Sequence, residues 1–431
     1  MLAALASSFR TPDLRKKILF TLALIAIYRF GAVVPTPGID YSAVQNCVNL
    51  VQDNSLYGLI NLFSGGALLQ LSIFALGIMP YITSSIILQL LVVVIPRLEA
   101  LKKEGQAGQT KITQYTRYLT VALAILQATT ILTLARTPGR LFQGCNEQLI
   151  PDQTIPVIIT MIIAMTAGTA IIMWFGELIT DRGVGNGMSI LIFTSIIATI
   201  HGQFVRILQG SGWVTFAIVV GVGLVVIAAV VYVEQAQRRI PVQYAKRMVG
   251  SKMYGGASTY IPLKVNMAGV IPVIFASSLL YIPQLVVTLT GSQDEWAQWI
   301  SRNMVNGTEP VYLTCYFILI IFFAYFYVSI TFNPTEVADN MKKYGGFIPG
   351  IRAGKPTAEY LDYVLTRLTL PGSLYLAVIA IIPFIAFGSL GLGQSFIFGG
   401  TSLLIVVGVG LDTVKQIESQ LQQRNYEGFL R

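Results

Sequence analysis

Uncharged apolar segments alternate with short polar, charged segments along the whole chain. A charged side chain at the middle of a bilayer costs about 2.5 to 3.5 kcal/mol on insertion scales, so uncharged runs of roughly 20 residues locate membrane-spanning helices. We predict ten such helices, at Ile18–Val34, Leu76–Pro96, Tyr118–Ala135, Ile155–Phe175, Gly187–Ile200, Ile207–Val233, Val265–Leu289, Val311–Phe332, Leu368–Phe387 and Gln394–Leu411. The pattern therefore predicts an all-α integral membrane protein built as one helical bundle.

Two uncharged runs are too long for a single span. The run from Leu368 to Leu411 has three glycines near its middle, which divide it into a helical hairpin of two spans. The run from Asn54 to Pro96 breaks only at Gly65 and Gly66, which leaves too little chain before the break to cross a bilayer. We therefore predict a re-entrant half-helix at about Phe63–Ile73, followed by one true span.

The positive charges are distributed asymmetrically about these spans. If the N-terminus is inside, only Arg136, Arg140, Arg206 and Arg302 of the 29 Lys and Arg lie in outside loops. Because cytoplasmic loops of membrane proteins carry such an excess of Lys and Arg, we predict that both termini are cytoplasmic. Arg29 lies within the first span, near its outer end, where a side chain that reaches towards the interface is the simplest interpretation.

Composition agrees with this picture. The chain is 54% hydrophobic and 11% charged, whereas soluble domains are about 25% charged. The net charge of +9 fits cytoplasmic loops better than a soluble nucleic-acid-binding domain. We expect no cleavable signal peptide, because Arg15, Lys16 and Lys17 directly precede the first span. With one His and three Cys, the sequence offers no metal-ligand cluster, and we expect neither a metal nor a cofactor.

The cysteines leave one question open. Cys47 and Cys145 both fall in predicted outside loops, where disulfides are stable. Two alternatives follow, a disulfide between them or two unpaired thiols. Cys315 lies within a predicted span and is expected to be part of the apolar core.

Two predicted inside loops, Glu234–Lys264 and Asn333–Arg367, are long, basic and interrupted by Gly and Pro. Such loops are too polar to be buried in the bundle. Either they dock cytosolic partners, or their charges only fix the topology.

The spans lack the ionisable groups that transport or hydrolysis requires. Ion-coupled transporters carry Asp, Glu, His or Arg at mid-depth, whereas Glu177, Glu234 and Asp412 lie at inner helix ends. Polar residues within spans are neutral, such as Gln89 and Gln127. Hydrogen bonds from such side chains contribute about 0.6 to 2 kcal/mol each. Two alternatives follow: helix contacts weak enough to open, or ordinary contacts within a static bundle. The chain thus fits a passive conduit better than a pump, a protease or another enzyme, with a transporter for an uncharged solute as the alternative.

Specific sequence strings narrow this conclusion. They occur in order from the first span to the last: FSGG at Phe63–Gly66, SIFALGIMPYI at Ser72–Ile82, KKEG at Lys102–Gly105, QYTRY at Gln114–Tyr118, DRGVGNG at Asp181–Gly187, PLKVNMAGVIP at Pro262–Pro272, GGFIPGIR at Gly345–Arg352, TRLTLPG at Thr366–Gly372 and GGTSLLIVVGV at Gly399–Val409. In these strings the chain resembles the SecY family, the central subunits of protein-translocation channels. The resemblance covers essentially the whole chain.

The resemblance implies a fold of two pseudo-symmetric five-helix halves around an hourglass pore. Residues 1–206 would form the first half, with helices one to five and a plug at about 63–73. Residues 207–431 would form the second half, with helices six to ten and the cytosolic loops 234–264 and 333–367. The implied function is that of a pore-forming subunit, not an enzyme, which passes unfolded polypeptides across the membrane and releases transmembrane segments laterally into lipid.

The resemblance also assigns residues to parts of the channel. The pore ring would be Ile82, Ile86, Met188, Ile192, Ile274 and Ile405, in which Met188 departs from the branched aliphatic type. The plug would comprise Phe63, Ser64, Gly65, Gly66, Ala67, Leu68 and Ile73. The lateral gate, where signal sequences bind, would lie between helices two and three and helices seven and eight, near Gln89, Gln127, Asn266 and Ile282. An apolar ring of this kind excludes ions by dewetting.

The resemblance finally implies partners. They are the ribosome, the motor ATPase SecA, small membrane subunits similar to SecE and SecG, unfolded polypeptides with signal sequences, and membrane lipids. Docking is expected at Arg238, Arg239, Lys246, Arg247 and Arg352, because Arg offers a planar fork for phosphate or carboxylate groups. The expected location is the inner, or plasma, membrane.

Overall fold

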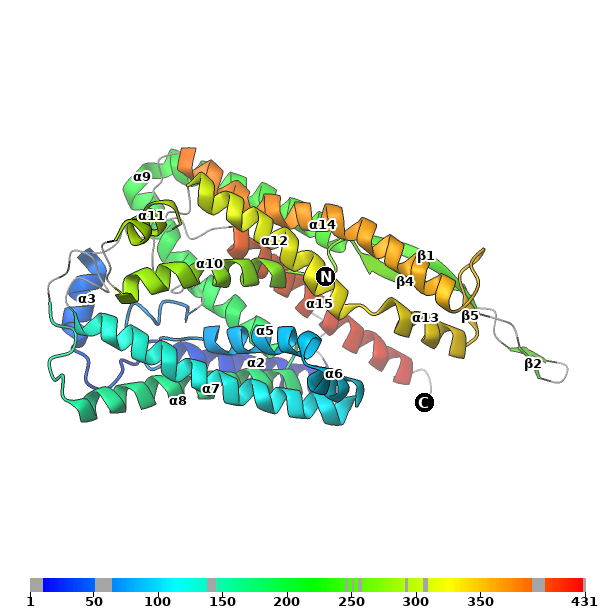
Figure 1. Ribbon diagram of the computed structural model, residues 1–431, viewed down its shortest axis with the longest axis horizontal. Coiled ribbons are helices and arrows are strands. Elements are labelled where there is room, and N and C mark those ends of the chain that lie inside the picture. The colour runs from blue at the N-terminus through cyan, green and yellow to red at the C-terminus, as the bar shows by residue number, and fades with distance from the viewer. Residues whose placement is uncertain are drawn as a thin grey trace.

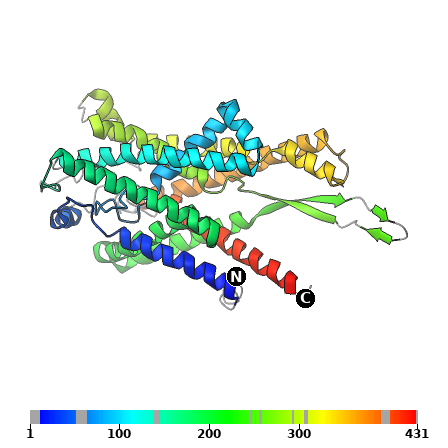
Figure 2. The same ribbon diagram turned by 90° about the horizontal axis from the view of Figure 1, so that it is seen from below.

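The computed structural model describes residues 11–50, 64–137, 145, 147–244, 247–249, 252–254, 258–290, 294–304, 309–389 and 400–428. The helices run broadly along the long axis of the molecule (Figure 1), and a slender extension of strands projects beyond them at one end (Figure 2). Helices α3 (Tyr41–Leu50) and α11 (Glu295–Asn303) lie at the opposite end. These helices belong to two of the predicted outside loops, which are thus separated from the long basic inside loops by the length of the bundle.

The helices of the N-terminal part follow the predicted spans, with different ends. They are α2 (Pro12–Gly31), α5 (Met79–Val94), α6 (Pro96–Lys103), α7 (Gln106–Arg136) and α8 (Ile155–Arg182). Helix α5 ends before Pro96, and Ile95 is extended because a residue before proline avoids the helical region. The chain turns there by 99° into α6. Helix α7 begins well before Tyr118, so this helix continues out of the predicted span on the side of the basic loops.

Helix α9 (Gly187–Gln235) contains the predicted fifth and sixth spans. Its start is capped by Asn186, whose side-chain oxygen accepts hydrogen bonds from the backbone N–H groups of Met188 and Ser189. The predicted loop at residues 201–206 is helical. The break lies instead at Gly212, with φ 78° and ψ 175°, a conformation that glycine adopts without strain. The division of the chain into halves at residue 206 stays a prediction.

The C-terminal helices are α10 (Ile271–Thr290), α12 (Pro310–Thr331), α13 (Pro334–Lys343), α14 (Lys355–Ser389) and α15 (Gly400–Gly428). Of the three glycines of the predicted turn, Gly388 is still helical in α14, and Gly391 and Gly393 lie outside the described residues. Among the described residues, five helices are long and apolar enough to cross a membrane, or six if the bent α5 and α6 pair is one span. The count of ten spans therefore stays a prediction.

The two long loops contain strands that the sequence did not predict. β1 (Gln237–Tyr244) pairs antiparallel with β4 (Ser258–Lys264) and with β5 (Gly346–Phe347), and β2 (Arg247–Val249) pairs with β3 (Lys252–Tyr254). Because β5 comes from the second loop, the order β4-β1-β5 joins both loops into one unit. This unit has an apolar core of its own: Ile240, Val242, Leu263, Met341, Ile348, Leu361 and Val364 are buried together.

The structure selects the disulfide from the two alternatives for Cys47 and Cys145. The two residues are bonded, with Cα atoms 5.4 Å apart. Both are buried in an apolar cluster that also contains Leu68 and Leu71. The cross-link thus joins α3 to the loop before α8, directly over the segment that the resemblance assigns to the plug.

Loss of this disulfide is expected to destabilise the outer end of the molecule. The bond links residues 98 positions apart, and cross-links of such loops contribute about 2 to 4 kcal/mol to stability. We expect the Cys47→Ser, Cys145→Ser double variant to unfold at lower temperature than wild type, in detergent, by circular dichroism. Cys315→Ser serves as the control. Equal unfolding temperatures for wild type and the double variant would contradict this expectation.

Candidate pore constriction and gate

A cavity of about 530 Å³ lies between helices from both parts of the chain. Its walls include all of the residues assigned to the pore ring, namely Ile82, Ile86, Met188, Ile192, Ile274 and Ile405. These residues come from α5, α9, α10 and α15. Ile82 and Ile86 are one helical turn apart and share a face of α5. The structure therefore brings the whole predicted ring to one place, from positions far apart in the sequence.

Met188 fits this wall because of a glycine behind it. A Cβ atom placed on Gly176 of α8 would lie 2.3 Å from the Met188 sulfur. Any larger residue at 176 would thus push Met188 away. The absence of a side chain at Gly176 makes room for the unbranched Met188. This explains how a methionine fits at a ring position where the resemblance implies a branched aliphatic residue.

The segment before α5, residues 64–78, is termed the plug segment below. Residues 65–78 form a series of turns and one β-bridge, rather than the regular half-helix predicted from hydropathy. Positive φ angles at Gly65, Gly66, Leu71 and Gly77 interrupt any helix. Phe63, which the resemblance also assigns to the plug, lies outside the described residues.

The plug segment is held against the end of α2 by backbone hydrogen bonds. The Thr36 N–H donates to the Leu71 carbonyl at 3.1 Å, and the Ile73 N–H donates to the Val34 carbonyl at 3.0 Å. Pro35 and Ser72 form the β-bridge between these two bonds. These contacts fix the middle of the segment to the chain that follows α2.

Two glycines allow neighbouring helices to approach the plug segment closely. A Cβ atom on Gly31 of α2 would lie 2.2 Å from the Phe74 ring, and one on Gly168 of α8 would lie 2.2 Å from the Ile73 carbonyl oxygen. Ala67 and Phe74 are buried in the same apolar cluster as Ile192, Ile274 and Ile405. Ser64 and Ala67 have no accessible surface. The plug segment is therefore buried and shares an apolar cluster with three of the ring residues.

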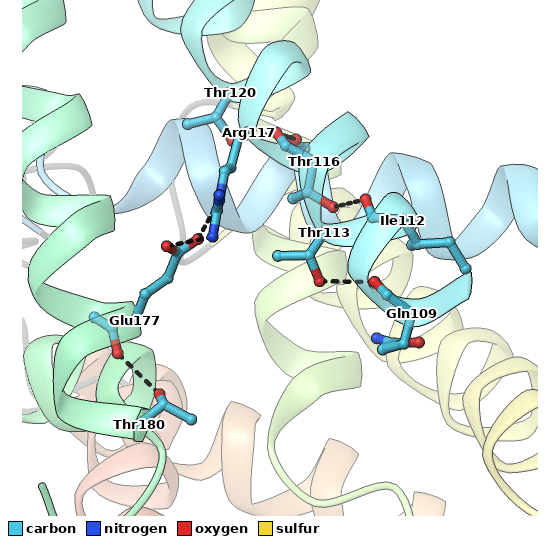
Figure 3. A network of polar contacts seen from close by, with 10 residues as sticks. Gln109, Ile112, Thr113, Thr116, Arg117, Thr120, Glu177 and Thr180 are labelled. Carbon is cyan, nitrogen blue, oxygen red and sulfur yellow. Dashed lines mark hydrogen bonds and ion pairs between the residues drawn. The ribbon is translucent and has the colours of Figure 1, made fainter. Parts of the chain in front are cut away.

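Part of the cavity wall is polar. That part includes Thr113, Arg117, Glu177, Thr180 and Asp181. The side chains of Arg117 and Glu177 point towards each other from α7 and α8 (Figure 3), and they form two parallel hydrogen bonds of 2.8 Å. The Arg117 side chain is 49% exposed, so this ion pair contributes at most about 1 kcal/mol. It ties α7 to α8 and does not cross the cavity.

The three lateral-gate residues whose side chains the structure describes, Gln89, Gln127 and Asn266, do not gather at one place. Gln89 lines the cavity, and its amide donates to Ser85 at 3.4 Å. Gln127 is partly buried on α7 and is not part of the cavity wall. The Asn266 amide donates to Glu234 at 2.6 Å, at the end of α9. Ile282 belongs to α10, but its side chain lies outside the described residues.

Helices on both sides of the predicted gate nevertheless face the same cavity. Gln89 of α5 and Thr113 of α7 line it from one side, and Phe275 of α10 and Tyr327 of α12 line it from the other. The sequence missed the Asn266 and Glu234 contact. The two residues are 32 positions apart, and no local pattern in the sequence pairs them.

The predicted docking residues lie on the unit formed by the two long loops. Arg238 and Arg239 are exposed on β1, and the Arg239 guanidinium lies 4.8 Å from the centre of the Tyr260 ring. Arg352 is exposed before α14. Arg247 belongs to β2, but its side chain lies outside the described residues, as does all of Lys246. No group of three or more metal-binding side chains occurs within the described part of the chain.

Apolar side chains from both parts of the chain that line one cavity, beside a buried segment and polar side chains, are the features of a conduit in a helical membrane protein. The family model for SecY matches residues 72–414 of this chain. The chain belongs to the SecY family. Members of this family are translocase subunits and not enzymes. This chain, likewise, is not an enzyme.

Individual relatives agree with this assignment. The chain is 67% identical to the protein translocase subunit SecY of Streptomyces scabiei over 438 residues, with 100% of both chains covered. One similar solved structure is of a SecY protein whose plug domain stabilises the closed state of the translocation channel. It is 19% identical to this chain, with a TM-score of 0.62, and the match covers 94% of this chain and 91% of that chain. Sec61 in a canine ribosome-channel complex is 18% identical, with a TM-score of 0.59 and the same coverage of both chains. The structural likenesses confirm the predicted fold class, a multi-pass helical membrane protein.

Proposed function

We propose that this chain is the pore-forming subunit of a protein-conducting channel, which passes unfolded secretory polypeptides across the membrane. One observation carries the proposal: six apolar residues from four helices, far apart in sequence, line a single cavity, and three of them share an apolar cluster with the plug segment. The relative from Streptomyces scabiei, a protein translocase subunit, supports it.

The ring and the plug segment would act together as the barrier of the closed channel. A ring of Ile and Met side chains carries no charge that attracts ions, and a narrow apolar constriction excludes water by dewetting. The plug segment would fill the pore beyond the ring. During translocation the flexible ring side chains would close around the moving polypeptide, while the plug segment leaves its position.

Transmembrane segments would leave sideways into lipid, between α5 and α7 on one side and α10 and α12 on the other. The cavity wall shared by these four helices supports this route. Gln89, Gln127, Asn266 and Ile282 are the proposed gate residues. Since the Arg117 and Glu177 pair joins α7 to α8, the gate would open without breaking this pair.

The unit of strands and basic loops would dock cytosolic partners. The ribosome is the partner favoured by the likeness to Sec61 in a ribosome-channel complex, and a SecA motor would use the same exposed surface. Arg238, Arg239, Lys246, Arg247 and Arg352 are the proposed contacts, because guanidinium groups bind phosphate and carboxylate in a bidentate way. Small subunits similar to SecE and SecG would pack against the helices within the plasma membrane.

The proposed topology, with both termini and the strand unit in the cytoplasm, gives a direct prediction. In a Cys315→Ser background, a cysteine at the exposed Ala353 is expected to react with a membrane-impermeant maleimide only from the cytoplasmic side. A cysteine at the exposed Ser301 of α11 is expected to react only from outside. Labelling of intact cells and of inverted vesicles measures this. Reaction of position 353 in intact cells would overturn the topology.

Complementation tests the function itself. In cells depleted of their own channel subunit, expression of this chain is expected to restore export of a reporter with a normal signal sequence. Failure of a membrane-inserted chain to restore export, together with uptake of a small uncharged solute by vesicles that contain the chain alone, would favour the transporter alternative instead.

A further inference from the structure

Arg29 makes a contact that its position in a membrane span does not explain. It lies in the last turn of α2, and its Nη1 atom donates a hydrogen bond of 2.7 Å to the carbonyl oxygen of Gly65. A charged side chain within a span is costly, and such residues are kept where they have a specific role. An arginine whose side chain only reached towards the membrane interface would direct its guanidinium to water. This one is bonded to the plug segment.

The backbone of Gly65 is shaped to receive this bond. Its φ of +67° belongs to a region that favours glycine, and a Cβ atom there would lie 2.8 Å from Arg29 Nη1 and 3.1 Å from the Cα atom of Ser195. The Gly65 backbone is thus in direct contact with both α2 and α9. Ser195 follows the ring residue Ile192 by about one helical turn, so the bond lies next to the constriction.

The plug segment also has backbone hydrogen bonds to residues 34 and 36 and a stacked contact between Phe74 and the Tyr28 ring, but the hydroxyl of Tyr28 bonds elsewhere. The Tyr28 hydroxyl, which has no accessible surface, shares a hydrogen bond of 2.6 Å with the Ser195 hydroxyl. This bond joins α2 to α9. The apolar cluster that holds Ala67 and Phe74 together with ring residues acts through non-directional contacts, which weaken gradually as groups separate. The Arg29 bond is directional and is lost over a short displacement.

We propose that Arg29 holds the plug segment in its closed position through the Gly65 carbonyl, and thereby sets how strong a signal sequence must be to open the channel. This inference rests on the proposed function. A hydrogen bond from a charged donor shifts an equilibrium by a factor of roughly 10 to 100. Without it, the open state is populated more often, and a weaker signal sequence suffices to complete opening.

The test follows the plug segment and the channel separately. Ala67, which is fully buried, is changed to Cys in a Cys315→Ser background, and its reaction with an impermeant maleimide added outside reports departure of the plug segment. Export of a reporter with a defective signal sequence reports function. Both are measured in Arg29→Leu, which removes the donors, and in Arg29→Lys, which keeps a charged donor. Tyr28→Phe is the matched control, since it removes a hydrogen bond of the adjacent residue that does not involve the plug segment.

We expect Arg29→Leu to raise both the alkylation rate and the export of the defective reporter about tenfold or more, and Arg29→Lys and Tyr28→Phe to stay within about twofold of wild type. Gly65→Ala tests the same contact from the other side, but its methyl group would also meet the Ser195 Cα atom at a φ that favours glycine, so an increase there counts only beside an increase in an Arg29 variant. If Arg29→Leu is not inserted stably, Arg29→Met, which also removes the donors, takes its place.

Wild-type rates in Arg29→Leu and Gly65→Ala would overturn the proposal, as would an equal increase in Tyr28→Phe, which would indicate general loosening of α2. These outcomes are distinct from failure of the proposed function. If the function is wrong, wild type does not restore export of the normal reporter, whereas the alkylation rates still report on the bond between Arg29 and Gly65.

Discussion

Ile274→Asn is expected to let precursors with defective signal sequences through the channel and to raise its resting ion conductance. Ile274 is buried beside Ile192 and Ile405. The amide places a polar group in the constriction, which lets water enter, and it removes apolar contact worth about 1 to 3 kcal/mol. A closed channel that must open readily is favoured by only a few kcal/mol. The change is therefore comparable with the whole closing bias.

The design includes controls for general damage. Ile274→Leu keeps the volume and the apolar character, and we expect wild-type behaviour. Ile163→Asn makes the same chemical change on the exposed face of α8, away from the cavity. Export of a signal-defective reporter and conductance in planar bilayers are the two measurements. If both stay at the wild-type level in stably expressed Ile274→Asn, this residue does not line the barrier.

The sequence predicted the ring only through its resemblance to a family. The spacing of Ile82 and Ile86 shows that they share a helix face, which is a local property. Hydropathy carries no information on whether that face meets Ile274 and Ile405. These residues are roughly 200 and 300 positions away along the chain. Their meeting depends on how α5, α10 and α15 pack. The structure supplies this packing.

Hydropathy was least informative where the chain is apolar but not regular. The run before α5 suggested a half-helix, because no charge interrupts it. Positive φ angles at Gly65 and Leu71, and the bridge between Pro35 and Ser72, make it a series of turns instead. Tertiary hydrogen bonds to the end of α2 decide this conformation, and they are not encoded in any local period.

Polar contacts were also hidden from the sequence. Arg29 was interpreted as a side chain that reaches the interface, because its acceptor is a backbone carbonyl that carries no charge and leaves no signal in the sequence. The strands of the basic loops were missed for a related reason. β1 alternates weakly between exposed and buried positions, and its partner β5 is only two residues long and comes from another loop.

Arg352→Glu is expected to abolish most export while leaving the channel assembled. The backbone around Arg352 is fixed: its carbonyl accepts a hydrogen bond of 2.8 Å from the buried Thr357 hydroxyl, and Gly350 and Gly354 adopt positive φ angles on either side. An exposed guanidinium is thus presented on a rigid loop. Rigid presentation lowers the entropic cost of docking. Charge reversal at a buried contact would cost about 2 to 5 kcal/mol of binding free energy.

The loss is expected in partner binding and not in folding, because Arg352 is exposed and lies outside the apolar core of the strand unit. Lys343→Glu changes the net charge of the same unit by the same amount at another exposed position, so it separates a specific contact from general electrostatic attraction. Arg352→Lys keeps the charge but loses the planar fork, and an intermediate defect is expected. Affinity for purified ribosomes and for the motor ATPase, measured on detergent-solubilised channel, reports the effect alongside export. Equal defects in Lys343→Glu and Arg352→Glu would show that the surface attracts its partners by charge alone, and normal export by Arg352→Glu would remove this residue from the docking site.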